Sequence, residues 1–233
     1  MKFLLTSAGI TNDSIHAALV DLLGKPTAEA RAICVPTAIY ALPGGNGYAW
    51  RMLRELADIG WHDLGVLELT TLPTILEEHW LPAVEAADII IVGGGNSGYL
   101  CYWIEQSGFG RRLPALLQNK VYMGVSAGSL IVTHSFQIDA EVLARTGIYR
   151  DADYDEDAPP NAGSNKTLGL VDFVIRPHLN ADWLPQATLD RFAKSAAKID
   201  VPMYAFDDQT AIKVVDGNVE VISEGEWKLF DKA

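Results

Sequence analysis

The chain has few cysteines, no long hydrophobic run and a deficit of positive charge. Its two cysteines, Cys34 and Cys101, are far apart among 233 residues, so we expect two buried free thiols and a reducing compartment. No stretch approaches the ~18 consecutive apolar residues of a membrane span. Eighteen Lys and Arg oppose 30 Asp and Glu, which gives a formal net charge of −12. This balance disfavours nucleic acid and anionic membranes as partners, because both need clustered basic residues.

Several familiar signals are also missing. The apolar run at residues 2–6 is too short for a signal peptide, so a cytoplasmic protein is expected. The acidic segment 147–168 alternates aspartates as a calcium loop does. Counted from Asp151, however, its sixth position is Glu156 instead of glycine, and the closing glutamate is absent. We therefore predict no metal and no cofactor.

What the chain does contain is an alternation of apolar strands and helices. Continuous apolar strands separated by helices indicate a parallel sheet covered on both faces, here in one α/β domain over residues 1–233. Predicted strands cover residues 2–6, 31–36, 64–69, 88–92, 121–125, 170–177, 204–206, 211–215 and 219–223. Predicted helices cover residues 12–23, 72–86, 99–118 with a break near Gly108, and 182–198. A further helix is predicted from the end of a loop at 42–47 to about residue 59. The last two strands are joined by Asp-Gly-Asn, a hairpin signal.

The most informative motif is Gly124-Val125-Ser126-Ala127-Gly128, which follows the strand at 121–125. A serine between two glycines at a strand-to-helix junction is typical of a nucleophile elbow, which projects the hydroxyl out of the sheet. The following helix directs its free N–H groups at the same point, where an oxyanion could be stabilised. Ser126 is therefore the predicted nucleophile, although a plain Gly/Ser turn fits the pattern too.

A serine nucleophile needs a base, and five histidines are available. His178 follows a predicted strand, at the end where parallel sheets gather their sites. His134 is expected to end the helix after Ser126 and to point away. Asp208, Asp207 and Asp139 are the candidates for the carboxylate that orients the base, and the residues alone leave these three open.

The oxyanion needs a second donor besides the Ala127 N–H. Gly93-Gly94-Gly95-Asn96 directly follows the apolar strand at 88–92, and its glycines permit a close backbone approach. Taken alone, this loop could equally bind a phosphate at a helix N-terminus. It fits neither the G-x-G-x-x-G pattern nor a P-loop.

These motifs together resemble the peptidase E family, serine peptidases of the aspartyl dipeptidase and cyanophycinase group. The resemblance rests on Ile-Val-Gly-Gly-Gly-Asn, on Gly-Val-Ser-Ala-Gly-Ser about thirty residues later, on Arg-Pro-His, and on Leu-Leu-Thr-Ser-Ala-Gly, Val-Pro-Thr-Ala and Asp-Asp-Gln-Thr-Ala-Ile elsewhere. It implies a flavodoxin-like three-layer sandwich with a mostly parallel sheet and a small C-terminal hairpin, related to class I glutamine amidotransferases.

The resemblance also implies roles for residues. Ser126 would be the nucleophile, His178 the base, and the backbone of Gly94, Gly95 and Ala127 the oxyanion hole. Asp208, or Asp207 beside it, stands where relatives carry a glutamate. Dipeptidases of the family prefer an N-terminal aspartate, which implies a cation in the pocket. Candidate substrate-binding residues are Asn96, Arg176, Arg191, Arg150 and Lys166.

We thus predict a serine exopeptidase that acts on short peptides, as a monomer or a homodimer. Two alternatives stay open. One is an esterase or other non-peptidase hydrolase, because α/β-hydrolases share Gly-x-Ser-x-Gly. Those enzymes usually carry their histidine near the C-terminus, whereas no histidine follows His178 here. The other is an inactive binding protein of the amidotransferase-like fold.

Overall fold

The computed structural model describes residues 1–136, 138–159 and 161–232. Its β-strands are β1 (Lys2–Thr6), β2 (Arg31–Val35), β3 (Asp63–Val66), β4 (Ile89–Val92), β5 (Val121–Val125), β6 (Arg150–Asp151), β7 (Glu156–Asp157), β8 (Val174–Arg176), β9 (Met203–Phe206), β10 (Thr210–Val215), β11 (Asn218–Ser223) and β12 (Trp227–Phe230). Its α-helices are α1 (Asp13–Leu23), α2 (Gly45–Asp58), α3 (Leu81–Ala86), α4 (Ser97–Gln106), α5 (Phe109–Leu116), α6 (Ala127–Leu130), α7 (Ala140–Thr146) and α8 (Leu189–Ala196). Short 3₁₀ helices are η1 (Thr27–Glu29), η2 (Thr37–Ala41), η3 (Leu69–Thr74) and η4 (Glu77–His79).

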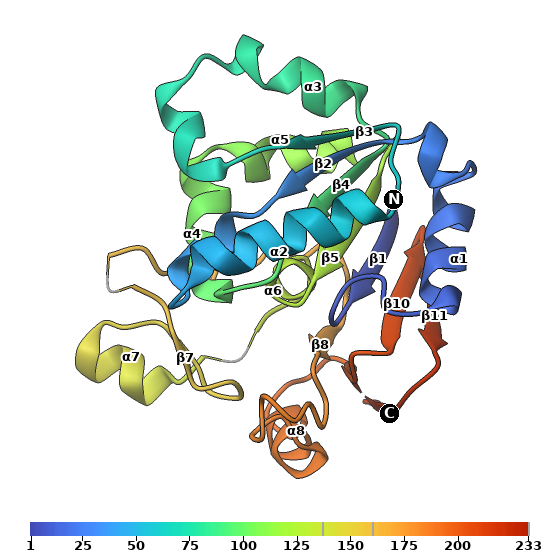
Figure 1. The fold of residues 1–233 in the computed structure, drawn as a ribbon. Helices are drawn as coiled ribbons and strands as arrows, with labels where there is room; N and C mark the ends of the chain where they lie inside the picture. Colours follow the sequence, from blue (N-terminus) through green and yellow to red (C-terminus); the bar gives the residue numbers. More distant parts are fainter. Residues whose placement is uncertain (137, 160, 233) are drawn as a thin grey trace.

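A seven-stranded sheet with the order β11-β10-β1-β5-β4-β2-β3 forms the centre of the molecule (Figure 1). Strands β1 to β5 pair in parallel, and β10 and β11 add an antiparallel hairpin to the β1 edge. This is the predicted flavodoxin-like α/β fold with its C-terminal hairpin. A second sheet, β12-β9-β8, packs beside the large one.

The large sheet is covered on both faces, as its continuous apolar strands require. Leu4, Cys34 and Ile91 pack on one face against helices α1 and α2. Phe3, Val35 and Ile90 pack on the opposite face against helices α3, α4 and α5 and the β8–β9 strands. None of the helices in the described part of the chain has the length and apolar character needed to span a membrane.

Local signals explain where helix α1 begins and ends. The Asn12 side chain accepts a hydrogen bond of 2.9 Å from the Ile15 N–H, which satisfies an otherwise free donor of the first turn. Gly24 ends the helix in the left-handed conformation, with φ of 70°. The helix thus occupies the predicted range.

Some predicted helices are shorter or interrupted. Residues 72–86 do not form one helix. They divide among η3, η4 and α3, and Pro73, which lacks an N–H donor, lies inside η3. The helix predicted over 182–198 begins only at Leu189, because Thr188 caps it by accepting the Arg191 N–H. The helix after Ser126 ends at Leu130, so His134 is outside it.

The boundaries of other elements also differ from those predicted. Helix α2 starts at Gly45, inside the predicted loop, and the strand predicted over 170–177 is reduced to Val174–Arg176. Strand β12 was not predicted, and it pairs with β9 at the edge of the small sheet. The acidic segment 147–168 holds the short β6–β7 hairpin instead of a loop alone, and its residue 160 lies outside the described residues.

Candidate active site

Ser126 occupies a strained turn between β5 and α6. Its backbone has φ of 50° and ψ of −111°, which a non-glycine residue adopts only where the surroundings impose it. A side chain at either flanking glycine would clash with neighbouring backbone atoms. A Cβ on Gly124 would lie 2.6 Å from the Ser129 backbone, and one on Gly128 would lie 2.0 Å from the Val92 carbonyl oxygen. The Gly-x-Ser-x-Gly pattern therefore permits a tight contact of β5, α6 and β4.

His178 lies two residues beyond the end of β8. The residue is 7% exposed and its backbone is left-handed, with φ of 64°. The ring Nε2 is 2.8 Å from Ser126 Oγ. The main chain around His178 is held at several points, because its N–H donates to Ser7 Oγ at 2.8 Å and the Tyr154 hydroxyl donates to the Pro177 carbonyl at 3.0 Å. The histidine is thus fixed against the serine.

Asp208 follows β9, and its Oδ1 is 2.6 Å from His178 Nδ1. Burial raises the pKa of Asp208, but hydrogen bonds and charge from His178, with further hydrogen bonds from Ser7 and Trp183, outweigh it and leave the pKa below its usual value. The carboxylate form is therefore favoured beside the imidazole.

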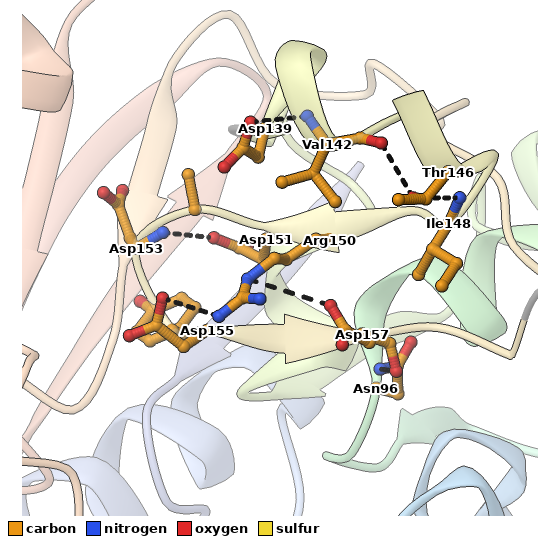
Figure 2. Close-up of polar contacts among 12 residues, drawn as sticks. Asn96, Asp139, Val142, Thr146, Ile148, Arg150, Asp151, Asp153, Asp155 and Asp157 are labelled. Atoms are coloured by element: carbon orange, nitrogen blue, oxygen red, sulfur yellow. Dashed lines mark hydrogen bonds and ion pairs between the residues drawn. The ribbon is translucent and has the colours of Figure 1, made fainter. Parts of the chain in front are cut away.

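The other two carboxylates considered from the sequence lie elsewhere. Asp207 accepts from the N–H groups of Gln209 and Glu226 and from the Thr210 hydroxyl, so it organises the turn. Asp139 caps helix α7 by accepting the Val142 N–H at 3.0 Å, as Figure 2 shows. Of the three candidates, the structure brings only Asp208 to His178.

The backbone of Gly94 and of Ala127 borders Ser126, and Gly95 follows Gly94 in the same loop. A Cβ on Gly94 would be 3.2 Å from the Ser126 Cβ. Gly95 has φ of 136° and is packed so closely on Ala38 that a Cβ would lie 2.3 Å from its carbonyl group. Within the described residues, the N–H groups of Gly94, Gly95 and Ala127 have no backbone or side-chain acceptor. These donors are available to a bound group.

The residues expected to bind substrate mostly have partners within the fold. Arg176 is fully buried and its Nε donates to Asp153 Oδ2 at 2.5 Å. Asn96 is 2% exposed, because its side chain caps α4 through the Tyr99 N–H and donates to the Asp157 carbonyl. The Nη2 group of Arg176 has no hydrogen-bond partner among the described residues, but it is buried with the rest of the side chain.

The remaining cations considered from the sequence also have acidic partners. Arg191 and Arg150 both bind the Asp155 carboxylate, the latter visible in Figure 2, and each keeps 33% of its side chain exposed. Lys166 pairs with Glu105 at 2.7 Å. His134 is exposed, and its backbone N–H donates to the Phe173 carbonyl.

Two neighbours of the site were missed from the sequence. Ser7 lies directly after β1, and its hydroxyl contacts both His178 and Asp208. Its position just beyond a central strand was the signal that could have identified it. Trp183, 63% exposed, presents its ring at 68° to the His178 ring, with centroids 4.7 Å apart. No sequence pattern marked it.

A hydroxyl, an imidazole and a carboxylate in one hydrogen-bonded chain form an arrangement that can activate the hydroxyl as a nucleophile. All of them lie beyond the carboxyl ends of strands, where open α/β sheets bind their ligands. With free N–H donors beside the hydroxyl, the site is suited to acyl transfer.

Comparisons with known proteins agree with this reading. The sequence model of peptidase family S51 matches residues 3–222. A candidate peptidase E protein of Listeria monocytogenes EGD-e shares the fold with a TM-score of 0.61 and 20% identity, over 95% of this chain and 98% of its own. A peptidase of an acI-B1 actinobacterium gives a TM-score of 0.57 and 16% identity, over 99% and 94%. No curated protein matches in sequence. The family match covers almost the whole chain, which therefore belongs to peptidase family S51, the peptidase E family of serine peptidases.

Proposed function

We propose that this serine peptidase is an exopeptidase that hydrolyses short peptides with a free N-terminus, using Ser126, His178 and Asp208 as its catalytic triad. The observation that carries the proposal is the continuous chain of contacts from Ser126 Oγ to His178 Nε2, 2.8 Å, and from His178 Nδ1 to Asp208 Oδ1, 2.6 Å. Within a family of serine peptidases, this is the arrangement that the chemistry needs.

In the proposed reaction, Ser126 Oγ attacks the scissile carbonyl carbon while His178 Nε2 takes its proton. Asp208 holds the proton on Nδ1 and stabilises the imidazolium that forms. The N–H groups of Gly94, Gly95 and Ala127 receive the oxyanion of the tetrahedral intermediate. When the C–N bond breaks, His178 gives its proton to the leaving amine. A water molecule then hydrolyses the acyl-enzyme by the same steps, and Ser126 is regenerated.

We further propose a preference for an N-terminal aspartate, which the family resemblance supports. Among the cations considered from the sequence, Arg176 is unsuited because it is fully buried. Arg191 and Arg150 are the better candidates, since each is partly exposed while it pairs with Asp155. An aspartyl substrate would compete with Asp155 for them.

A panel of Asp-Leu, Leu-Leu and N-acetyl-Asp-Leu tests the proposal. We expect wild-type enzyme to cleave Asp-Leu fastest and the blocked peptide not at all, and Ser126→Ala to lose about 10⁴–10⁶-fold in kcat. Near wild-type turnover by Ser126→Ala would remove the nucleophile assignment. Cleavage of internal bonds in a long blocked peptide would contradict exopeptidase action, and faster cleavage of Leu-Leu would remove only the aspartate preference.

A further inference from the structure

We propose that Ser7 is a positioning residue of the active site, which fixes the His178–Asp208 pair in the geometry that Ser126 requires. This inference rests on the proposed function, because it assigns Ser7 a role in the same triad. Ser7 would act through its neighbours, without touching substrate.

The surroundings of Ser7 point to this role. It follows β1, the central strand that lies between β5 and β10, and it is fully buried. Its Oγ is 2.5 Å from Asp208 Oδ1, 2.8 Å from the His178 backbone nitrogen and 3.1 Å from His178 Nδ1. One buried hydroxyl thus meets the carboxylate, the ring and the main chain of the other two residues.

Proton counting fixes the direction of each hydrogen bond. The His178 backbone N–H can only donate, so Ser7 Oγ must accept it. An ionised carboxylate can only accept, so the single hydroxyl proton of Ser7 goes to Asp208 Oδ1. The Nδ1 proton of His178 has the same carboxylate oxygen at 2.6 Å. This tautomer leaves Nε2 free to accept the Ser126 proton.

The hydrogen bond from the His178 N–H to Ser7 Oγ supports the backbone conformation of His178. His178 is held at φ of 64°, a conformation that a residue with a Cβ rarely adopts without support. Its N–H points to Ser7, and its carbonyl accepts from the Ala181 N–H at 3.1 Å. Loss of the Ser7 hydroxyl would leave a buried N–H without an acceptor, and the loop could relax toward a commoner conformation. The imidazole would then move away from Ser126.

The contact with the carboxylate predicts an electrostatic signature. The hydrogen bond from Ser7 is one of the interactions that keep the Asp208 pKa low against burial. Without it the carboxylate becomes more basic and holds a proton on the His178–Asp208 pair more tightly. The acid limb of the kcat/KM profile should therefore move to higher pH.

The experiment compares Ser7→Ala with Thr6→Val in the full-length chain, assayed with the best dipeptide substrate. Thr6 is the matched control, since it is equally buried but its hydroxyl bonds to two backbone groups, the Gly124 carbonyl and the Gly9 N–H. We expect Ser7→Ala to lower kcat by about 10–100-fold, as losses of orienting hydrogen bonds behind a reacting group do, with KM little changed and the acid limb shifted upward. Thr6→Val should leave the pH profile in place.

A double-mutant cycle with Asp208→Asn separates positioning from general destabilisation. Because Ser7 contacts both His178 and Asp208, adding Ser7→Ala to Asp208→Asn should lower kcat by clearly less than the same change does in the wild-type chain. Full additivity of the two losses, or an unshifted acid limb in Ser7→Ala, would overturn the inference. Should Ser7→Ala fail to fold, Ser7→Cys keeps the volume with a weaker donor, and the same shift is expected.

The outcomes also distinguish this inference from the proposed function. If Ser126→Ala is inactive while Ser7→Ala matches wild type in kcat and pH profile, the triad stands and only the role of Ser7 is wrong. If Ser126→Ala keeps its activity, the proposed function itself fails.

Discussion

The two residues that flank Pro177, Arg176 and His178, each pair with an aspartate, and the surroundings of the two pairs differ sharply. Arg176 and Asp153 are sealed in the interior, with 0% and 3% of their side chains exposed, and Ser195 donates a further hydrogen bond to Asp153. His178 and Asp208 lie at the edge of the sheet, where the carboxylate keeps 30% of its side chain exposed. The inner pair is closed off from solvent, whereas His178 of the outer pair contacts Ser126.

The difference shows how solvent accessibility determines whether a paired aspartate serves stability or chemistry. A buried pair gains little net stability, but removing one partner leaves an uncompensated charge. The inner pair therefore ties β8 to the turn between β6 and β7, which Ser195 of helix α8 also contacts. The outer pair retains a proton that can move. The predictions below test this contrast.

The largest effect should come from His178→Ala, which removes the proposed base. We expect kcat to fall as far as in Ser126→Ala, about 10⁴–10⁶-fold, and the double variant to be no worse than either single one, because the two act as a unit. His134→Ala, at an exposed position, is the control and should be nearly silent. Exchanged effects of the two histidines would contradict the assignment.

Asp208→Asn should lower kcat by roughly 10²–10⁴-fold, since an amide favours the wrong tautomer of the neighbouring imidazole. Asp207→Asn and Asp139→Asn should have far smaller effects on kcat, as their carboxylates bond to turn and helix-cap groups. Steady-state kinetics on one dipeptide compares all three. A dominant loss in Asp207→Asn or Asp139→Asn would show that the acid is misassigned.

Asp153→Ala should mainly lower stability, by about 3–5 kcal/mol in the free energy of unfolding, because it removes the carboxylate that is hydrogen-bonded to the buried Arg176 guanidinium and leaves only Asp151 to oppose that charge. Asp155→Ala is the control, since its carboxylate is 45% exposed beside Arg150 and Arg191, and such pairs contribute less than about 1 kcal/mol. Urea denaturation measures both. Equal losses in the two variants would show that burial of the inner pair has no special consequence.

The smallest effect concerns Asp151 and Glu156, which face each other across the β6–β7 hairpin. Burial raises the pKa of Asp151 to about 6, against the opposing charge of Arg176, and burial together with the Asp151 charge raises that of Glu156 to about 7. Both values exceed those of an unfolded chain, about 3.9 and 4.3. The folded state therefore binds more protons between about pH 4 and 7, and its stability falls as the pH rises through this window.

Glu156→Gln should remove part of that pH dependence. We expect its Tm to exceed that of wild type at pH 8 by about 2–4 °C, the effect of about 1 kcal/mol in a chain of this size, with little difference at pH 4. Thermal melts at both pH values measure this. An equal Tm change at both would show that proton binding by Glu156 is not responsible.

The central sheet was largely predictable because its strands are continuous apolar runs that end in glycine or polar residues. Ser126, the Gly94–Gly95 loop and His178 could be found because each directly follows such a strand. The interrupted 72–86 region was not predictable, since its apolar spacing is helical while Pro73 and local turns divide it. The apolar residues of this region are buried by segments distant in the sequence, so the local sequence did not indicate where the helix is interrupted.

Within the site, the sequence could not distinguish Asp207 from Asp208, because the choice depends on a turn that bonds Asp207 to Glu226 and Thr210. It also kept Arg176 among the candidate cations for substrate, since nothing local marks its partner Asp153, 23 residues away in the chain. Ser7 was missed because its two partners, His178 and Asp208, are separated from it by 171 and 201 positions in the sequence.

The most direct test is covalent labelling of the wild-type protein with a fluorophosphonate, followed by intact-mass and peptide analysis. We expect one adduct per chain, located on Ser126, formed much more slowly in His178→Ala and absent in Ser126→Ala, while Asp153→Ala is still labelled below its unfolding temperature. A folded wild-type protein that takes up no label, or that is labelled at another serine such as Ser7 or Ser129, would contradict it.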